Sequence, residues 1–398
     1  MWNEPDQEVN LLQKESNEVV NENFLQVEIE IEIETEDLNT SEEIEAEKDP
    51  NKEIQIEKEN ESEKEKEKET WGYIYMDNGL GGLGDRFRAS IVGYYIALLT
   101  NRALKINGQL MWGSEDDYFD TNIVNWKVSE EEKQVFGSPN TRRVEERIGH
   151  QNKERYHEMN FDSYKDFEIF VFHTNTIFLD LLAANPTLRS SPKIQFFDDI
   201  VAKGLARSHA LKSLFKPGKK INQYLESFEK YYWPTNDTFR IGMHLRSGDN
   251  ERLISNSRKR GRYVTFETVE CFASKAISIW EEKKGSNEYK NVVFFVTADL
   301  NDFEEIVIRK IQSQGFKVFS HNNLGEAKHI HKSKADPFRT FVDWWTLTSM
   351  DVLLFSKSGF SESASHFSLA PSFVYNNNGG PCEHLFKPFD RTANLLFF

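Results

Sequence analysis

The sequence contains little cysteine and no long apolar segment. Its 398 residues include two cysteines, Cys271 and Cys382, which allow at most one disulfide and give no support for a secreted fold braced by disulfides. No stretch approaches the roughly 18 apolar residues of a membrane-spanning helix. The first ten residues, MWNEPDQEVN, lack the basic flank and apolar run of a signal peptide. These absences predict a soluble, cytoplasmic protein.

Aromatic residues are scarce in residues 1–70, where acidic residues dominate. This stretch holds 25 Asp or Glu and 7 Lys or Arg, a net charge of −18, whereas the whole chain carries −16. Residues 71–398 therefore sum to about +2, so the acidity says nothing about the folded part. With Trp2 and Phe24 as its aromatic residues, the stretch cannot bury enough apolar surface to offset the entropy of ordering. We predict a disordered acidic tail over residues 1–70.

Within this tail, residues 27–34 alternate Val or Ile with Glu (VEIEIEIE). A period of two is typical of an edge strand or of a strand that docks on a partner. The tail is therefore a candidate segment for binding another protein.

Residues 71–398 predict an α/β fold, because short apolar strands alternate with amphipathic helices. In the first half, residues 71–76 are a predicted strand, 87–98 a helix and 104–106 the next strand, which together start a right-handed βαβ unit. In the second half, helices near Asn301, Phe341 and Ser358 alternate with strands over residues 239–244, 291–296, 317–319, 352–355 and 372–375. This alternation favours parallel sheets covered by helices on both faces.

A glycine-rich loop joins the first strand to the first helix. Gly79, Gly81 and Gly84 match the dinucleotide fingerprint G-x-G-x-x-G. That fingerprint needs an acidic residue at the end of the second strand to hold the ribose, where residues 105–107 read Lys-Ile-Asn. A nicotinamide-dependent dehydrogenase is therefore disfavoured. Two interpretations remain: a turn whose glycines let helix and strand pack closely, or an anion-binding surface of backbone N–H groups at the helix start.

The strongest functional candidate is the loop after strand 239–244. His244, Arg246 and Asp249 form a His-x-Arg-x-x-Asp motif at the carboxyl end of that strand, where open α/β sheets bind ligands. Arginine suits phosphate because its planar guanidinium donates two parallel hydrogen bonds and keeps its charge. A surface salt bridge is the alternative interpretation.

Polar residues also follow other strands of the same predicted sheet. Thr297 and Asp299 end strand 291–296, and residues 358–362 open a helix after strand 352–355. The structural alternatives are a turn or helix cap for Asp299, an ordinary capping box for residues 358–362, and a solvent-facing charge for Asp343. Because carboxyl ends of parallel strands meet at one edge, we expect these residues to converge on a nucleotide site.

Four of these motifs, in this order, resemble the GDP-fucose fucosyltransferase superfamily. They are residues 81–86 (GGLGDR), His244-x-Arg246, residues 297–299 (Thr-Ala-Asp) and the region from Asp343 to Glu362. Residues 97–102 (ALLTNR) are similar to the helix after the glycine loop in plant xyloglucan fucosyltransferases. The superfamily also includes core N-glycan, nodulation and protein O-fucosyltransferases, and the resemblance spans roughly residues 72–376.

The resemblance implies a GT-B-like architecture in which two Rossmann-like domains face a cleft. We expect an acceptor-side domain over residues 71–236 and a GDP-sugar-binding domain over residues 237–398. The resemblance also implies inverting transfer of fucose from GDP-fucose to a hydroxyl of a glycan or protein acceptor. It implies neither a metal ion nor another cofactor, and we expect no nucleic-acid partner and no membrane span.

The resemblance also assigns roles to single residues. Arg246 would grip the diphosphate and stabilise charge on the leaving GDP, and His244 would support its loop or contact the donor. Asp85 is the candidate general base for the acceptor hydroxyl, with Glu362 a weaker second candidate, although Asp85 could equally be a first-turn carboxylate favoured by the helix dipole. The residues expected around the donor are Gly82, Gly84, Arg86, His244, Asp249, Thr297, Asp299, Asp343, Ser358, Gly359, Phe360 and Ser361.

No metal site is expected from the sequence. The acidic residues 115–117 lie in a polar loop and are interpreted as solvated, and His329 and His331 have no third ligand at a suitable spacing. Two alternative functions stay open: a transferase that uses another nucleotide sugar, and a binding protein that keeps the fold without turnover. Because Golgi members of the superfamily carry a membrane anchor, the Golgi lumen is an alternative location if the printed amino terminus is incomplete.

Overall fold

The strands expected from the sequence form two separate sheets in the computed structural model of the protein. The structure describes residues 72–77, 81–107, 118–233, 235–248, 263–286, 288–325, 337–376 and 380–392, all within one unit, Thr70–Phe398. The acidic tail, Gly79, Asp249, residues 115–117, His329 and His331 lie outside the described residues. No helix within the described segments is long and apolar enough to span a membrane.

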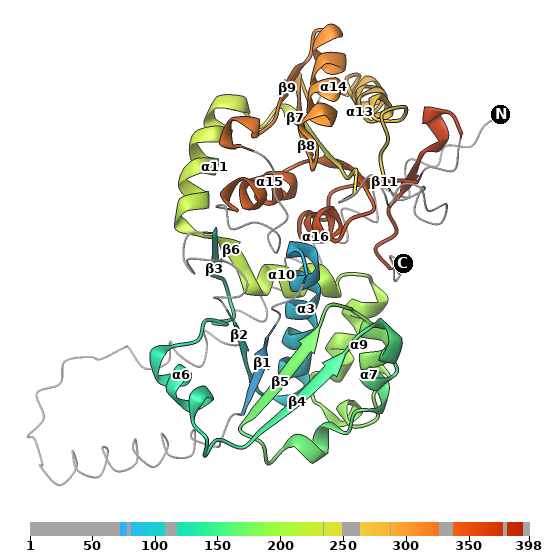
Figure 1. Ribbon diagram of the computed structural model, residues 1–398. Coiled ribbons are helices and arrows are strands. Elements are labelled where there is room, and N and C mark those ends of the chain that lie inside the picture. The colour runs from blue at the N-terminus through green and yellow to red at the C-terminus, as the bar shows by residue number, and fades with distance from the viewer. Residues whose placement is uncertain are drawn as a thin grey trace, which may run out of the picture. The chain divides into compact units, whose positions relative to one another are not determined.

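The first sheet consists of parallel strands in the order β2-β1-β5-β4 (Figure 1). Its strands are β1 (Tyr73–Met76), β2 (Ala103–Ile106), β4 (Arg143–Ile148) and β5 (Ile169–Thr174), and helix α3 (Leu83–Thr100) connects β1 to β2. Phe87, Ile91 and Tyr94 of α3 are buried, and α3 packs on β1 and β2, which confirms the expected βαβ unit. Neither β4 nor β5 was identified from the sequence. The edge strand β4 (RVEERI) exposes charged side chains on one face and lacks an apolar run, whereas β5 (IFVFHT) is a largely buried apolar strand that was overlooked.

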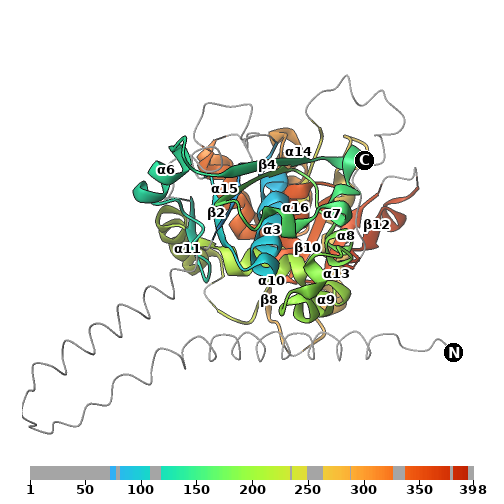
Figure 2. The ribbon, with the colours of Figure 1, turned by 90° about the horizontal axis from the view of Figure 1, so that it is seen from below.

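A short antiparallel strand pair and a series of helices surround the first sheet. The strands are β3 (Phe119–Thr121) and β6 (Phe215–Pro217), and the helices are α6 (Glu130–Gly137), α7 (Arg155–Glu158), α8 (Leu179–Ala183), α9 (Ile194–Ala202), α10 (Ala206–Leu214) and α11 (Lys219–Tyr232). Seen from below, α3 lies beside α10 (Figure 2). Because the sheet and α10 both pack against α3, most residues of this helix are buried.

The second sheet has the order β12-β11-β10-β7-β8-β9 and is parallel except for β12. Its strands are β7 (Thr238–Leu245), β8 (Asn291–Ala298), β9 (Lys317–Phe319), β10 (Val352–Ser356), β11 (Ser372–Tyr375) and β12 (Phe386–Pro388). Its helices are α13 (Glu270–Lys283), α14 (Asn301–Ser313), α15 (Phe338–Thr348) and α16 (Gly359–Ser368). Each strand and helix expected in this half is confirmed within a few residues, and the carboxyl ends of β7, β8 and β10 meet at one edge of the sheet.

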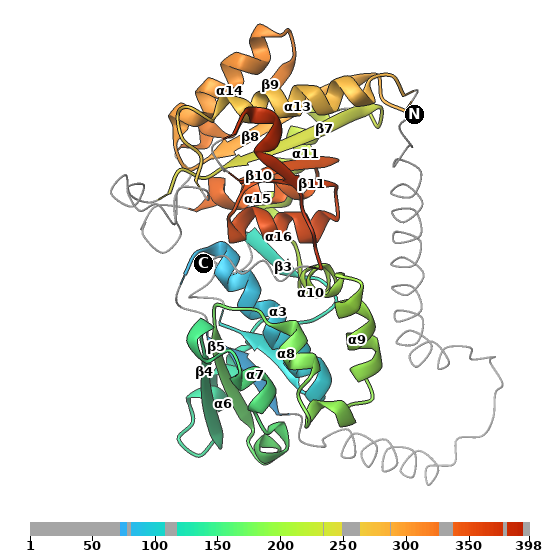
Figure 3. The ribbon, with the colours of Figure 1, turned by 90° about the vertical axis from the view of Figure 1, so that its right-hand side faces the viewer.

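The two sheets share part of their apolar core. Helix α16 packs against both α3 and α10 (Figure 3). The buried Phe87 ring lies 4.5 Å from the Trp344 ring, and the buried Phe119 ring lies 5.3 Å from the Phe341 ring. Burying one such side chain stabilises the fold by about 1.5–3 kcal/mol. The expected boundary near residue 237 therefore separates the two sheets, but residues on either side of it pack into one core.

The two cysteines of the chain form a disulfide. Cys271 lies in α13, and Cys382 lies in the turn before β12, 111 residues further along the chain. The bond therefore ties an outer helix of the second sheet to the segment that leads into the antiparallel edge strand β12.

Replacing both cysteines by alanine is expected to lower the free energy of unfolding by about 3–5 kcal/mol, because an open loop of this length gains entropy in the unfolded chain. Urea unfolding of the wild type and the double variant, each with and without dithiothreitol, measures the difference. The reductant should destabilise the wild type and leave the double variant unchanged. Equal midpoints under all four conditions, or two free thiols titrated in the native wild type, would contradict the pairing.

Candidate functional site

A cavity of about 360 Å³ lies between the carboxyl edge of the second sheet and the start of α3. Its walls come from the ends of β7 and β8, the first turns of α3 and α16, and one side of α15. The cavity gathers the following residues that the sequence placed at the donor or catalytic site: Gly82, Gly84, Asp85, His244, Arg246, Thr297, Asp299, Asp343, Ser358, Gly359 and Phe360. The structure thus brings these residues together, while their individual roles stay predictions.

Three residues expected at the site do not line this cavity. Arg86 is 4% exposed on α3, and burial lowers the pKa of its guanidinium. Ser361 is 1% exposed, and its hydroxyl donates to the carbonyl oxygens of Ser356 and Ser358 at 3.3 Å each. Glu362, the second candidate base, is 3% exposed and accepts hydrogen bonds from two arginines. The expectation that these side chains face the donor or acceptor is therefore corrected.

The start of α3 is shaped by glycine. Gly81 has φ +100°, a conformation that favours glycine, and Gly82 precedes the first helical residue. A Cβ atom on Gly84 would lie 2.2 Å from the carbonyl carbon of Gly359, so the backbones of α3 and α16 touch at this point. Asp85 accepts the N–H of Gly82 at 3.3 Å and so caps the helix. The close-packing interpretation is thus confirmed at Gly84, whereas the anion-binding surface stays a prediction, with the helix start lining the cavity.

A second helix, α16, also begins at the cavity. The Ser358 hydroxyl accepts the N–H of Phe360 at 3.3 Å, so Ser358 has the capping role left open by the sequence and lines the cavity as well. The N-terminus of an α-helix carries about half a positive charge and N–H groups without helical partners. With α3 and α16 both starting here, the cavity has a polarity that suits an anion.

The loop after β7 is fixed by a carboxylate from the neighbouring strand. Asp299 accepts the N–H groups of Ser247 at 2.7 Å and Gly248 at 3.1 Å, and it lies 3.7 Å from Nε of Arg246. The N–H of Arg246 donates to the Ser356 hydroxyl at 2.7 Å. Asp299 is therefore a turn-organising residue that also lines the cavity, and it holds Arg246 in place from one side while β10 holds it from the other.

His244 is a neutral side chain in the cavity wall. Burial, together with the nearby Arg246 cation, lowers the pKa of its imidazole to about 3. Its Nδ1 has no hydrogen-bond partner within the described part of the chain, and its ring lies 5.1 Å from the Phe360 ring. A neutral imidazole can donate from one nitrogen and accept at the other, so His244 offers uncharged hydrogen bonds next to Arg246.

Asp343 is buried, which excludes the solvent-facing interpretation. It is 1% exposed, and its Oδ2 accepts the Thr297 hydroxyl at 2.8 Å and lies 3.5 Å from Nε of Arg339. Burial raises the pKa of this carboxyl to about 7, and the nearby Arg339 cation opposes that rise. Arg339 also forms an ion pair with Glu304. The other oxygen, Oδ1, has no hydrogen-bond partner among the residues that the structure describes. Asp343 thus belongs to the cavity lining and carries a buried acceptor atom that none of the described residues satisfies.

The cavity also includes residues that the sequence did not single out. They are Leu83, Arg88, Ser247, Gly248, Tyr263, Ala298, Leu300 and Thr340. Arg88 follows Asp85 by three residues in α3, a spacing at which helical side chains meet, so the i,i+3 pair was a usable signal. Tyr263 lies against Gly248 from a distant part of the sequence, and no local pattern indicates that contact.

No cluster suited to a metal ion is found within the described ranges, where three or more His, Cys, Asp or Glu side chains nowhere come together. Activity without a metal remains a prediction.

The similarity of this chain to known proteins is found among solved structures. No protein-family model matches the chain, and no curated protein matches it. A mutant of Arabidopsis thaliana FUT1 in complex with GDP is similar to it, with a TM-score of 0.57 and 14% identity over 80% of this chain and 74% of that one. Two further structures match. Fucosyltransferase NodZ from Bradyrhizobium has a TM-score of 0.43 and 11% identity over 80% of this chain and 98% of that one. POFUT1 in complex with GDP has a TM-score of 0.43 and 11% identity over 77% of this chain and 99% of that one. The likeness to the Arabidopsis structure confirms the expected GT-B-like α/β fold.

Gly84→Ala is expected to destabilise the protein by about 1–3 kcal/mol, because the added methyl group overlaps the backbone of Gly359 and forces α3 and α16 apart. Thermal unfolding of the variant and the wild type measures the effect. Gly137→Ala is the matched control, since a Cβ atom there meets nothing within 4 Å. Equal melting temperatures for Gly84→Ala and the wild type would show that the two helices do not touch as described.

Proposed function

We propose that this protein is an inverting, metal-independent glycosyltransferase that moves fucose from GDP-fucose to a hydroxyl of a glycan or protein acceptor. One observation carries the proposal: Arg246 and the N-termini of α3 and α16 line one cavity. The proposal is supported by the fold, which is similar to that of an Arabidopsis FUT1 mutant in complex with GDP.

The diphosphate is the part of the donor that this cavity suits best. As the sugar leaves, negative charge grows on the β-phosphate of GDP, and donors aimed at that charge beforehand stabilise the transition state. Arg246 is such a donor, because Asp299 and Ser356 fix its loop from two neighbouring strands. The helix N-termini add a positive potential that needs no rearrangement during the reaction.

The buried carboxyl of Asp343 supports guanine as the base. Guanine presents two adjacent N–H donors, on N1 and on its exocyclic amine, and an ionised carboxylate accepts both. The Oδ1 atom of Asp343 has no hydrogen-bond partner among the described residues, so a guanine N–H that reaches it would satisfy it, while Thr297 donates to Oδ2. Adenine has an acceptor at N1, and its lone pair would face this oxygen, so the arrangement favours a guanine nucleotide.

Asp85 is the proposed general base for the acceptor. It lines the cavity at the start of α3, and its side chain is about one-third exposed. In an inverting transfer, the acceptor oxygen bonds to the anomeric carbon while the bond from that carbon to the β-phosphate oxygen breaks. The proton of the acceptor hydroxyl would pass to Asp85, and the electron pair of the broken bond would leave with GDP.

Another nucleotide sugar, or binding without turnover, is the alternative function. The residues of the cavity suit a diphosphate and a base but do not distinguish one sugar from another. Asp85 is already paired with Arg88 at 3.1 Å. That ion pair is the observation that favours a binding protein, because a paired carboxylate has less freedom to accept a proton.

The pairing of Cys271 and Cys382 bears on the compartment in which this protein works. Disulfides persist in oxidising compartments, whereas cytosolic thiols are kept reduced. The disulfide therefore supports a secretory lumen over the cytoplasm that the composition favours.

Arg246→Ala is expected to lower kcat for GDP-fucose turnover about 10²- to 10³-fold, because it removes a cation that stabilises the leaving diphosphate. Release of GDP from GDP-fucose, measured with EDTA present, tests both the activity and the absence of a metal requirement. Arg309→Ala, which removes an exposed arginine of α14 outside the cavity, is the control and should keep wild-type activity.

The outcomes of this assay separate the alternatives. Turnover of a different GDP-sugar would keep the enzyme class and change the sugar. GDP binding without turnover of any sugar nucleotide would favour the binding protein. A wild type that binds no guanine nucleotide would refute the proposal. Turnover that is abolished by EDTA would refute the metal-independent mechanism.

Guanosine binding is expected to tighten about tenfold between pH 6 and pH 8, because the Asp343 carboxyl, with a pKa of about 7, accepts the guanine N–H groups only when ionised. The groups around this carboxyl are Arg339, Glu304, Thr297 and Tyr224. Guanosine is used because it has no phosphate that titrates in this range. The Asp343→Asn variant should bind guanosine more weakly, and its affinity should not change with pH. If the variant keeps the wild-type dependence of guanosine affinity on pH, Asp343 is not part of the base site. Calorimetry measures both.

A further inference from the structure

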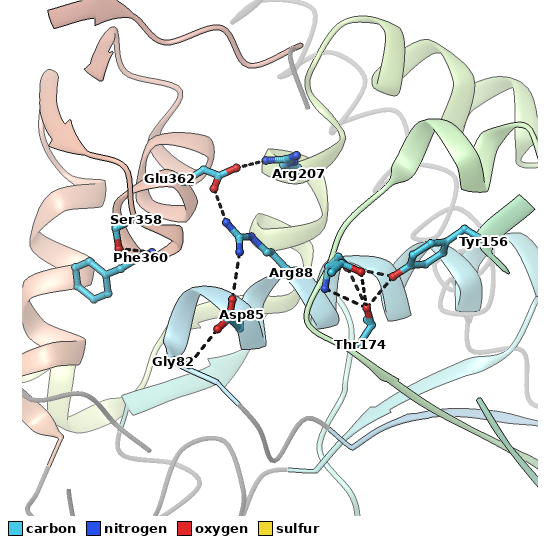
Figure 4. Close-up of polar contacts among 10 residues, drawn as sticks. Gly82, Asp85, Arg88, Tyr156, Thr174, Arg207, Ser358, Phe360 and Glu362 are labelled. Atoms are coloured by element: carbon cyan, nitrogen blue, oxygen red, sulfur yellow. Dashed lines mark hydrogen bonds and ion pairs between the residues drawn. The ribbon is translucent and has the colours of Figure 1, made fainter. Parts of the chain in front are cut away.

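Four charged residues meet where the first half of the chain contacts α16. We name them the junction cluster: Asp85 and Arg88 of α3, Arg207 of α10 and Glu362 of α16. Arg88 donates to Asp85 at 3.1 Å through one guanidinium nitrogen and to Glu362 at 2.8 Å through another. Arg207 donates to the other carboxylate oxygen of Glu362. Figure 4 shows Arg88 between the two carboxylates, with Arg207 on the far side of Glu362.

This cluster lies at the contact between the two helix N-termini. Gly84 and Gly359 touch there through their backbones, so the positive ends of α3 and α16 face each other at close range. Asp85 and Glu362 are the acidic residues of the first turns of these helices, where a negative charge is favourable. Arg88 joins the two carboxylates and so connects the first turn of α3 to the first turn of α16.

The two arginines of the cluster have different surroundings. Arg88 lines the cavity, whereas Arg207 does not, and Arg207 lies 3.2 Å from Nε2 of His366 in the interior. Burial, aided by the neighbouring arginines, lowers the pKa of His366, so this histidine stays neutral and adds no charge. Glu362 is therefore anchored from the interior by Arg207 and from the cavity side by Arg88.

We infer that Arg88 is a positioning residue that sets the spacing of the two helix N-termini for the diphosphate of the donor. This inference rests on the proposed function and extends it to a residue outside the four motifs that carry the family resemblance. The planar guanidinium suits the role because it has separate N–H groups for two carboxylates at a fixed angle. Arg88 acts on the donor through the backbone amides of α3 and α16, whose separation it fixes.

The test compares binding of a ligand that has the diphosphate with binding of one that lacks it. Arg88→Met keeps the length of the side chain and removes both ion pairs. We expect it to weaken GDP binding about 10- to 100-fold, since displacement of pre-aimed groups by about 1 Å has effects of that size. Guanosine binding should change less than about twofold, because the base site on β8 and α15 does not depend on the two helix starts. Calorimetry measures both ligands and inorganic pyrophosphate.

The matched control is Arg102→Met, at the second residue after the C-terminal end of α3. Arg102 also makes two side-chain hydrogen bonds, to the carbonyl oxygens of Tyr164 at 2.5 Å and Phe167 at 3.0 Å, and it does not line the cavity. Its loss should lower the melting temperature and leave the ratio of GDP to guanosine affinity unchanged. A similar fall in both affinities for Arg88→Met would mean that Arg88 is merely structural and would overturn the inference.

Glu362→Gln separates positioning from direct contact with phosphate. If Arg88 acts by spacing the helices, losing the carboxylate weakens GDP binding, as Arg88→Met does. If Arg88 instead binds phosphate directly, removing its competing carboxylate tightens GDP binding, and that result would overturn the inference. Arg88→Lys gives a second comparison: a single ammonium should restore GDP affinity only in part, whereas full restoration would show that charge alone is needed.

Failure of the proposed function has a different signature. A wild type that binds pyrophosphate but not guanosine would refute the guanine-nucleotide site, while the effect of Arg88→Met on pyrophosphate still tests the spacing of the helices. A wild type that binds neither GDP nor pyrophosphate would overturn both, because the paired helix N-termini would then hold no anion.

Discussion

The close contact between Gly84 and Gly359 is the constraint on which the rest of the site depends. It brings the first turns of α3 and α16 together at a distance that excludes a side chain at Gly84. Two positive helix ends therefore meet in one place, an arrangement that is costly unless negative charge is nearby. Asp85 and Glu362 supply that charge within the protein, and the cavity beside them can receive more of it from a ligand.

The side chains that face the cavity are held by others that do not. Ser356 lies behind Arg246, and the Glu304–Arg339 pair lies behind Asp343. These contacts hold Arg246 and Asp343 in the positions that the structure shows. Fixed donors and acceptors of this kind are what a site needs if charge is to be stabilised without rearrangement.

Much of the fold followed from the sequence, because most strands of the second sheet are buried and read as short apolar runs between helices. The carboxyl ends of those strands also located most of the cavity. The cavity residues that the sequence analysis placed wrongly or missed have a common geometric cause. Arg86 and Arg88 are two residues apart on one helix and so point about 200° apart, which puts Arg88 with Asp85 at the cavity and buries Arg86 elsewhere. The partner of Arg88, Glu362, is 274 residues away, and no local pattern indicates such a pair.

The junction cluster also decides what Asp85 can do. One oxygen of this carboxylate accepts Arg88 and the other accepts the N–H of Gly82. A carboxylate has about four acceptor sites, so these two bonds leave room for an acceptor hydroxyl at the cavity side. The same bonds fix the orientation of Asp85, as a general base requires. If the protein turns over its donor, Asp85 must accept a proton while it stays bonded to Arg88 and Gly82, whereas a binding protein makes no such demand on this carboxylate. The Asp85–Arg88 ion pair is therefore a place where the proposed transferase and the alternative binding protein would differ.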